Sequence, residues 1–140
     1  MFAQLDTKSV YSFMDSVVDL NSYVARAKEL GYQALGLMDR DNLYAAYHFA
    51  QLASGNGLRP LIGMEANLFY EGRKIPFRLL AKNNQGYKNL MKLATELSSG
   101  QREFTAFSDY LNAIALILPS EDSWFRGFHW GKTRRCWQRV

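Results

Sequence analysis

The chain has 140 residues, of which 48% are hydrophobic and 14% aromatic, and this composition suits one globular domain with a real core. It contains no apolar run of about 18 residues and no basic segment followed by an apolar run at its N-terminus. We therefore expect neither a membrane span nor a secretory signal. The single cysteine, Cys136, excludes an internal disulfide and fits a cytoplasmic protein.

The net charge of +4 is unevenly distributed along the chain. Residues 123–140 hold five basic residues, no acidic residue and all three tryptophans, whereas residues 1–122 hold all 13 acidic residues. We therefore predict a body, residues 1–122, and a separate basic tail, residues 123–140. The tail is either a frameshifted or truncated reading frame, which needs no selected purpose, or a nucleic-acid contact that pairs arginines with phosphates and tryptophans with bases.

In chain order, the body begins with a short apolar run at residues 2–5 that predicts a buried strand. Residues 20–30 then repeat apolar side chains at helical spacing, with Asp19 as the expected N-cap and Gly31 as the expected residue after the C-cap. The apolar positions of this predicted helix are Leu20, Tyr23, Val24, Ala27 and Leu30.

Beyond residue 31 the same two periodicities continue to alternate. We expect strands at residues 34–38, 58–70, 75–81 and 113–118, and helices at residues 43–54 and 87–97. The glycines of residues 54–57 end the second helix, and residues 71–74 form a turn between two strands. The apolar faces of these two helices are predicted at Leu43, Ala46, Tyr47, Ala50 and Ala53, and at Tyr87, Leu90, Met91, Ala94 and Leu97.

An acidic residue follows or ends each of the first three predicted strands: Asp6, Asp39 and Glu65. Alternating strands and helices predict crossover connections and a mainly parallel sheet, in which the carboxyl ends of the strands converge on one edge. Three acids at equivalent strand ends could form a metal or acid–base site. They could equally be loop acids that cap the helices that follow.

Several motifs resemble the PHP (polymerase and histidinol phosphatase) domain that opens bacterial DNA polymerase III alpha subunits. Residues 6–15 (DTKSVYSFMD) are similar to its first motif, residues 38–43 (MDRDNL) to its second and residues 60–65 (PLIGME) to its third. Residues 26–31 (RAKELG) and 80–93 (LAKNNQGYKNLMKL) are similar to stretches typical of the polymerase branch. The motifs follow the family's order and spacing.

The resemblance implies metal-site positions at Asp6, Lys8, Asp39, Arg40 and Glu65, where the family's metal-binding form carries histidines beside its acids. Lys8 and Arg40 stand at two histidine positions, and neither side chain has a lone pair to give a metal at neutral pH. We therefore expect a vestigial site with no catalytic residue and no bound metal. Its acids would be neutralised by ion pairs with the two cations, unless these side chains simply point into water. The two histidines, His48 and His129, are not expected as ligands.

The resemblance also implies a partial, distorted (βα) barrel, because a closed barrel of this kind needs roughly 200 residues. In the family the polymerase active site lies beyond the segment matched here. We therefore expect the N-terminal segment of a replicative DNA polymerase, inactive alone, that acts as a scaffold. Its partners would be the rest of the alpha subunit and the replisome, with DNA contacted through the parent protein, and the isolated chain would self-associate.

Three other functions stay open at this point. One is a stand-alone phosphoesterase of the PHP family, and another is a proofreading nuclease whose Mg²⁺ or Mn²⁺ is held by Asp6, Asp39 and Glu65 alone. The third is a nucleic-acid binder that works through the tail. The absent histidines and the polymerase-like stretch that ends at Leu93 argue against the first, and Lys8 and Arg40 argue against the second.

Overall fold

The computed structural model describes residues 3–12 and 16–117, which form a mixed α/β fold. The tail predicted at residues 123–140 lies outside the described residues. In chain order the elements are β1 (Ala3–Gln4), α1 (Leu20–Glu29), β2 (Ala34–Arg40), α2 (Ala46–Gly55), β3 (Arg59–Tyr70), β4 (Arg73–Ala81), α3 (Asn84–Ser98), the 3-10 helix η1 (Phe104–Tyr110) and β5 (Ile114–Ile117).

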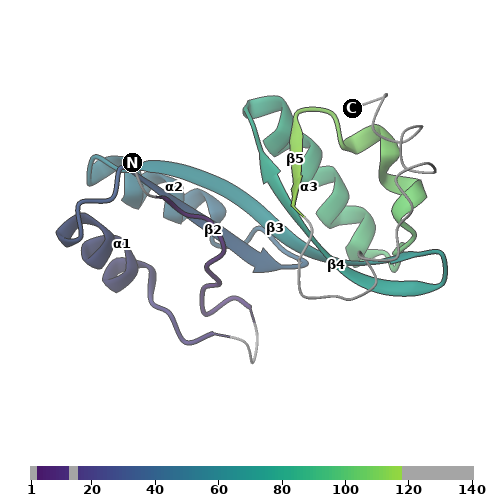
Figure 1. The fold of residues 1–140 in the computed structure, drawn as a ribbon, viewed down its shortest axis with the longest axis horizontal. Helices are drawn as coiled ribbons and strands as arrows, with labels where there is room; N and C mark the ends of the chain where they lie inside the picture. Colours follow the sequence, from purple (N-terminus) through teal and green to yellow (C-terminus); the bar gives the residue numbers. More distant parts are fainter. Residues whose placement is uncertain (1–2, 13–15, 118–140) are drawn as a thin grey trace.

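The strands form one curled sheet in the order β1-β2-β3-β4-β5, and the long β3–β4 hairpin joins its two halves (Figure 1). β1 pairs with β2 and β2 with β3 in parallel, whereas β3–β4 and β4–β5 are antiparallel. Among the described strands, β4 alone therefore runs against the others. Its reversal comes from the tight turn at Glu71 and Gly72, whose φ angles of 50° and 73° are typical of a hairpin turn. The predicted α/β class, with mainly parallel strands alternating with helices, is confirmed.

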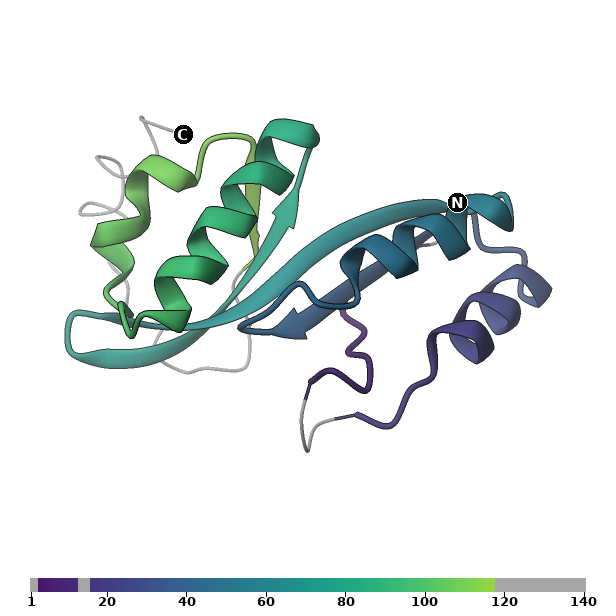
Figure 2. The ribbon, with the colours of Figure 1, turned by 180° about the vertical axis from the view of Figure 1, so that it is seen from behind.

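Alternate residues of β3 separate the two faces of the sheet. Ile62, Met64 and Leu68 point to the face on which the helices pack, whereas Gly63 and Glu65 point to the opposite face. The strand pairing carries this alternation into the neighbouring strands. Figure 2 shows α2, α3 and η1 in front of the sheet. The charged side chains around Glu65 described below lie on the opposite face, whereas Asp39, the register partner of Met64, lies on the helix face.

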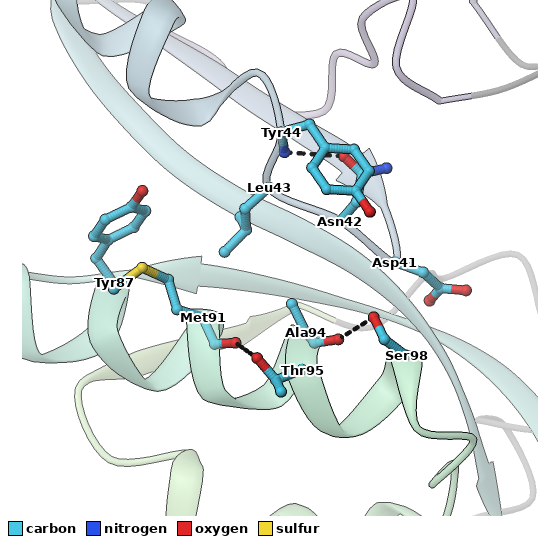
Figure 3. A pocket seen from close by; sticks show the side chains of 9 residues that line it. All are labelled: Asp41, Asn42, Leu43, Tyr44, Tyr87, Met91, Ala94, Thr95 and Ser98. Atoms are coloured by element: carbon cyan, nitrogen blue, oxygen red, sulfur yellow. Dashed lines mark hydrogen bonds between the residues drawn. The ribbon is translucent and has the colours of Figure 1, made fainter.

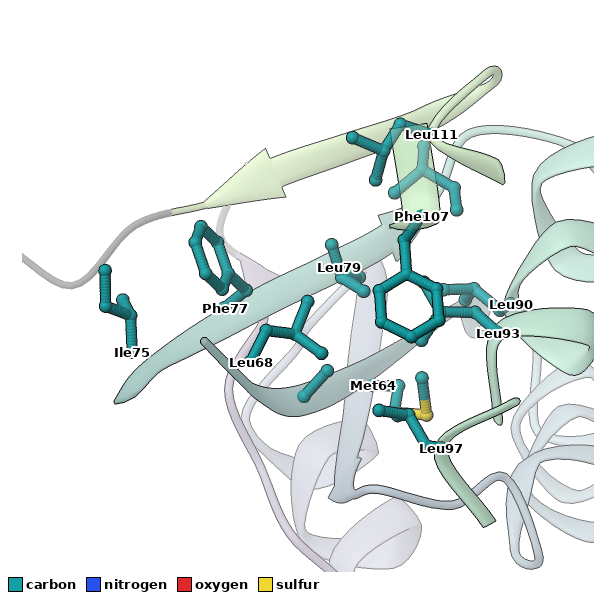
Figure 4. Packing of buried hydrophobic residues seen from close by; sticks show 12 residues of the cluster. Met64, Leu68, Ile75, Phe77, Leu79, Leu90, Leu93, Leu97, Phe107 and Leu111 are labelled. Atoms are coloured by element: carbon teal, nitrogen blue, oxygen red, sulfur yellow. The ribbon is translucent and has the colours of Figure 1, made fainter. Parts of the chain in front are cut away.

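The apolar interior has two parts. The first lies between α1, α2 and the β2–β3 half of the sheet, with Val24, Leu35 and Phe49 at its centre. The second fills the space between the β3–β4 hairpin, α3 and η1, and Phe107 and Leu93 are fully buried in it (Figure 4). Two cores in a short chain mean that each half of the sheet is held by its own helices.

The residues predicted to begin and end α1 are confirmed, whereas some predicted buried positions of the helices are not. The Asp19 side chain accepts a hydrogen bond from Ser22 N at 3.0 Å and so caps α1, and Gly31 follows the C-cap at φ 72°. Three predicted face positions were wrong, because Leu30, Tyr47 and Met91 are 51%, 69% and 42% exposed.

The buried positions of α2 and α3 are set by the sheet rather than by the helix sequence. In α2 the buried side chains are Ala46, Phe49 and Ala53, so its core face is centred on Phe49. In α3 Leu93 is buried where Met91 was expected. Both helices carry apolar residues on more than one face. Periodicity alone therefore could not identify which face of each helix is buried. Within the described part of the chain, no helix combines the length and apolar character needed to cross a membrane.

Candidate functional site

Three charged residues form a row across neighbouring strands on the helix-free face of the sheet. Arg40 of β2 is the register partner of Glu65 of β3, and Glu65 is the register partner of Arg78 of β4. Directly paired residues point to the same side of a sheet and have their Cβ atoms about 4.5–5.5 Å apart. Strand register therefore places a carboxylate between two guanidinium groups.

Glu65 is the centre of this cluster, and its side chain is only 5% exposed. Its Oε1 accepts a hydrogen bond from Arg40 Nε at 3.1 Å, and its Oε2 lies 3.1 Å from Lys8 Nζ. Arg78 Nε lies 3.8 Å from the same Oε2. Both carboxylate oxygens thus face cations, which compensates for much of the cost of burying the charge.

The pKa of Glu65 reflects two opposing effects. Burial raises the pKa of this carboxyl, whereas the hydrogen bonds and charges of Lys8 and then Arg40 lower it. The cations outweigh the burial, so the pKa lies below its ordinary value of 4.5. Glu65 is therefore ionised at neutral pH.

Asp6 belongs to the same cluster through a residue that sequence reasoning missed. Its Oδ2 lies 2.9 Å from one terminal nitrogen of Arg78, and the two side chains are 37% and 27% exposed. Arg78 Nε is the one buried side-chain polar atom in the described residues without a hydrogen-bond partner. The signal that could have identified Arg78 is a lone charge inside the apolar alternation of residues 75–81.

Asp39 was expected to pair with Lys8 or Arg40, but its carboxylate is instead held by hydrogen bonds from two serines. Its Oδ1 accepts hydrogen bonds from Ser9 N and Ser12 Oγ, and its Oδ2 accepts one from Ser9 Oγ, all at 2.7 Å. Ser12 Oγ in turn accepts from Arg40 N at 3.0 Å. The carboxylate is 2% exposed, so these three donors replace water and bind the segment before α1 to β2.

The five predicted positions therefore separate into two neighbouring groups. Lys8, Arg40 and Glu65 are in direct contact, and Asp6 joins them through Arg78. Asp39 sits among serines, on the other side of its strand from Arg40. Within residues 3–12 and 16–117, no three His, Cys, Asp or Glu side chains are grouped so that they could hold a metal ion.

The motifs agree with what comparison with known proteins finds. The PHP domain matches residues 4–129 of the chain. The chain belongs to the PHP domain family. The match ends within residues 123–140, so the boundary at residue 122 stays a prediction.

Curated relatives of the PHP segment include DNA polymerase III alpha subunits. The segment is 50% identical over 121 residues to the DNA polymerase III subunit alpha of Streptococcus pyogenes, which covers 86% of this chain and 12% of that protein. It is 33% identical over 126 residues to the same subunit of Bacillus subtilis, covering 86% of this chain and 11% of the relative. The chain thus spans about an eighth or less of the length of these relatives.

A solved structure supports the fold independently of sequence. A crystal structure of a Bifidobacterium adolescentis protein assigned as a metal-dependent phosphoesterase superposes with a TM-score of 0.55 at 16% identity. The match covers 67% of this chain and 32% of that chain. At this identity the likeness extends to the fold alone, and it agrees with a partial PHP-type barrel.

Proposed function

We propose that this chain is the PHP segment of a replicative DNA polymerase alpha subunit and that it serves there as a non-catalytic scaffold. The observation that carries the proposal is the Glu65 carboxylate, whose two oxygens face Lys8 and Arg40 at 3.1 Å each. The sequence similarity to polymerase III alpha subunits supports such a subunit as the parent protein. The remainder of that subunit and the replisome would be the partners, and DNA would be contacted through the parent protein.

The residues at the family's metal positions do not fit a divalent metal. A lysine ammonium and an arginine guanidinium are donors without a lone pair, so neither can coordinate one. Each would also repel a divalent cation at 4 Å by about 8 kcal/mol at an effective dielectric of 20. Asp39, the remaining buried acid, already accepts three hydrogen bonds from serines. The site is therefore better suited to joining strands than to phosphoester chemistry.

Metal content and metal affinity test the proposal directly. We expect protein purified without chelator to contain far less than one transition metal per chain, and to hydrolyse neither p-nitrophenyl phosphate nor single-stranded DNA with added Mn²⁺ or Zn²⁺. The double variant Lys8→His/Arg40→His supplies two imidazoles beside Glu65 and Asp6. It should gain a Mn²⁺- or Zn²⁺-dependent rise in melting temperature that the parent chain lacks.

A matched control separates restored coordination from a general loss of positive charge. Arg59→His/Lys82→His makes the same exchange at two exposed residues outside the cluster. It should give no metal-dependent shift. Stoichiometric metal in the parent chain that disappears in Glu65→Ala or Asp39→Ala would instead mean that the acids hold a metal, and the scaffold proposal would fail.

A further inference from the structure

A second feature lies away from the charged cluster, between the loop that follows β2 and one side of α3. It is a hollow of about 300 Å³ lined on the loop side by Asn42, Leu43 and Tyr44 and on the helix side by Tyr87, Met91 and Thr95, among others (Figure 3). Tyr44 N donates to Asn42 Oδ1 at 3.1 Å, so the loop that carries Tyr44 is held in a defined turn.

Two of the hydroxyl groups on the helix wall of this groove are already used within α3. Thr95 Oγ1 donates to Met91 O at 3.0 Å, and Ser98 Oγ donates to Ala94 O at 2.9 Å. Both hydroxyl protons are therefore used within α3, as the dashed lines in Figure 3 show. What remains for a ligand on this wall is the apolar surface of Met91 and Ala94 and the side chain of Tyr87.

Large apolar side chains at the groove are left in water. Tyr44 is 78% exposed and Met91 is 42% exposed. Methionine adapts its shape to different partners, and a tyrosine offers a large rigid surface at low entropic cost. Exposed apolar side chains gathered at a concave site are typical of a protein-interaction surface.

The charges at the rim are positive. Lys88 and Lys92 are exposed on α3, one turn apart, and each lies three residues before a groove residue, Met91 or Thr95. Neither lysine forms an ion pair with another described residue of the chain. The acid at the groove, Asp41, is already paired with Arg102 at 2.7 Å. A ligand with negative charge beside an apolar anchor would complement both features.

We propose that this groove docks a short segment of another protein that carries an apolar anchor side chain flanked by acidic residues. The anchor would lie against Leu43, Tyr44 and Met91, and the acids would face Lys88 and Lys92. A nucleic acid fits less well, because Leu43, Met91 and Ala94 make much of the lining apolar and offer no partner for phosphates. The inference does not depend on the proposed scaffold function, since the groove shares no residue with the charged cluster.

The test is a selection from a randomised 12-residue peptide library displayed on phage, with the 140-residue chain as bait. We expect enriched peptides to combine one or two large apolar residues with Asp or Glu. A fluorescent copy of the most enriched peptide should bind about tenfold more weakly to Lys88→Glu/Lys92→Glu, a change equivalent to about 1.4 kcal/mol. Tyr44→Ala should weaken it too, and this highly exposed position can be truncated without disturbing the core.

The matched control is Arg73→Glu/Lys74→Glu, which makes the same charge change at the exposed start of β4. Its affinity for the peptide should stay within about twofold of the parent chain. The proposal is wrong if no sequence class is enriched, or if the two double variants weaken binding equally. It is also wrong if a dT12 oligonucleotide binds the chain more tightly than the peptide and loses that binding in the same groove variants.

Discussion

At the scale of single residues, each of the three acids that follow or end the first strands is satisfied in its own way. Glu65 faces cations from three different segments, Asp6 faces Arg78, and Asp39 accepts from serines. The sequence indicated that Lys8 and Arg40 would face an acid, and for Glu65 they do. It could not indicate Arg78, because the contact depends on the register of the β3–β4 hairpin.

The lowered pKa of Glu65 predicts how this cluster responds to acid. A group whose pKa is lower in the folded than in the unfolded state stabilises the fold above its unfolded value, and that contribution is lost as pH falls through the folded value. For Glu65 the contribution should be complete above about pH 4.5 and decline below it. Glu65→Gln should therefore lower the free energy of unfolding by about 1.5–3 kcal/mol at pH 7.

The measurement is urea unfolding of the parent chain and of Glu65→Gln at a series of pH values from 7 to 3. Other carboxyls titrate in the same range, so the informative quantity is the difference between the two proteins. This difference should shrink as the pH drops below 4.5. A difference that stays constant across the series would show that the ionised carboxylate contributes nothing through its cations.

At the scale of elements, α3 is fixed to the sheet by a very close approach at its first turn. A Cβ atom on Gly86 would overlap the carbonyl oxygen of Ala113, which lies just before β5. The same carbonyl accepts a hydrogen bond from Lys82 N at 2.9 Å, and Asn89 Nδ2 donates to Asn112 O at 2.8 Å. Ala113 itself has a φ of 60°, a conformation that favours glycine.

Gly86→Ala should consequently destabilise the chain by about 1–3 kcal/mol, the usual cost of overfilling a packed site, although alanine is the better helix former. Gly55→Ala is the matched control, because Gly55 also lies in a helix but has no atom within 4 Å of an added Cβ. That substitution should be neutral or stabilise by up to about 1 kcal/mol. Thermal unfolding of both variants measures the contrast, and equal effects would refute the close-packing explanation.

At the scale of the whole molecule, the sheet formed by the described residues ends at β1 and β5, and the described helices pack on one of its faces. β1 and β5 each use only one edge for pairing within the described residues, and the open face carries half-buried side chains such as Ala115 of β5. Free edges pair with other chains. We predict that the isolated chain self-associates, so light scattering should give a mass above 16.1 kDa that rises with protein concentration.

A charge placed on the open face should oppose this association. Ala115→Lys should lower the apparent mass, whereas Gln101→Lys, the same kind of change at an exposed residue away from the face, should leave it unchanged. A sharp, concentration-independent monomer peak combined with cooperative melting of the parent chain would contradict the prediction.

The sequence by itself determined the features that depend on neighbours along the chain. Short apolar runs indicated the strands, Asp19 and Gly31 indicated the ends of α1, and the ordered motifs indicated the PHP family. The 3-10 helix η1 was not predicted. Phe104, Phe107 and Tyr110 recur every third residue, which matches three residues per turn, but the segment has only seven residues and is held through the burial of Phe107.

Only the tertiary structure decided which side chains meet across the sheet and which helix faces are buried. Strand register placed Arg78 beside Glu65, and the fold of the segment before α1 brought Ser9 to Asp39. Met91 was left at an open groove rather than in the core for the same reason. The Glu65–Arg78 contact joins residues 13 positions apart, and the Ser9–Asp39 contact joins residues 30 positions apart. Periodicity reports only a residue's local face, so it cannot select partners over such distances.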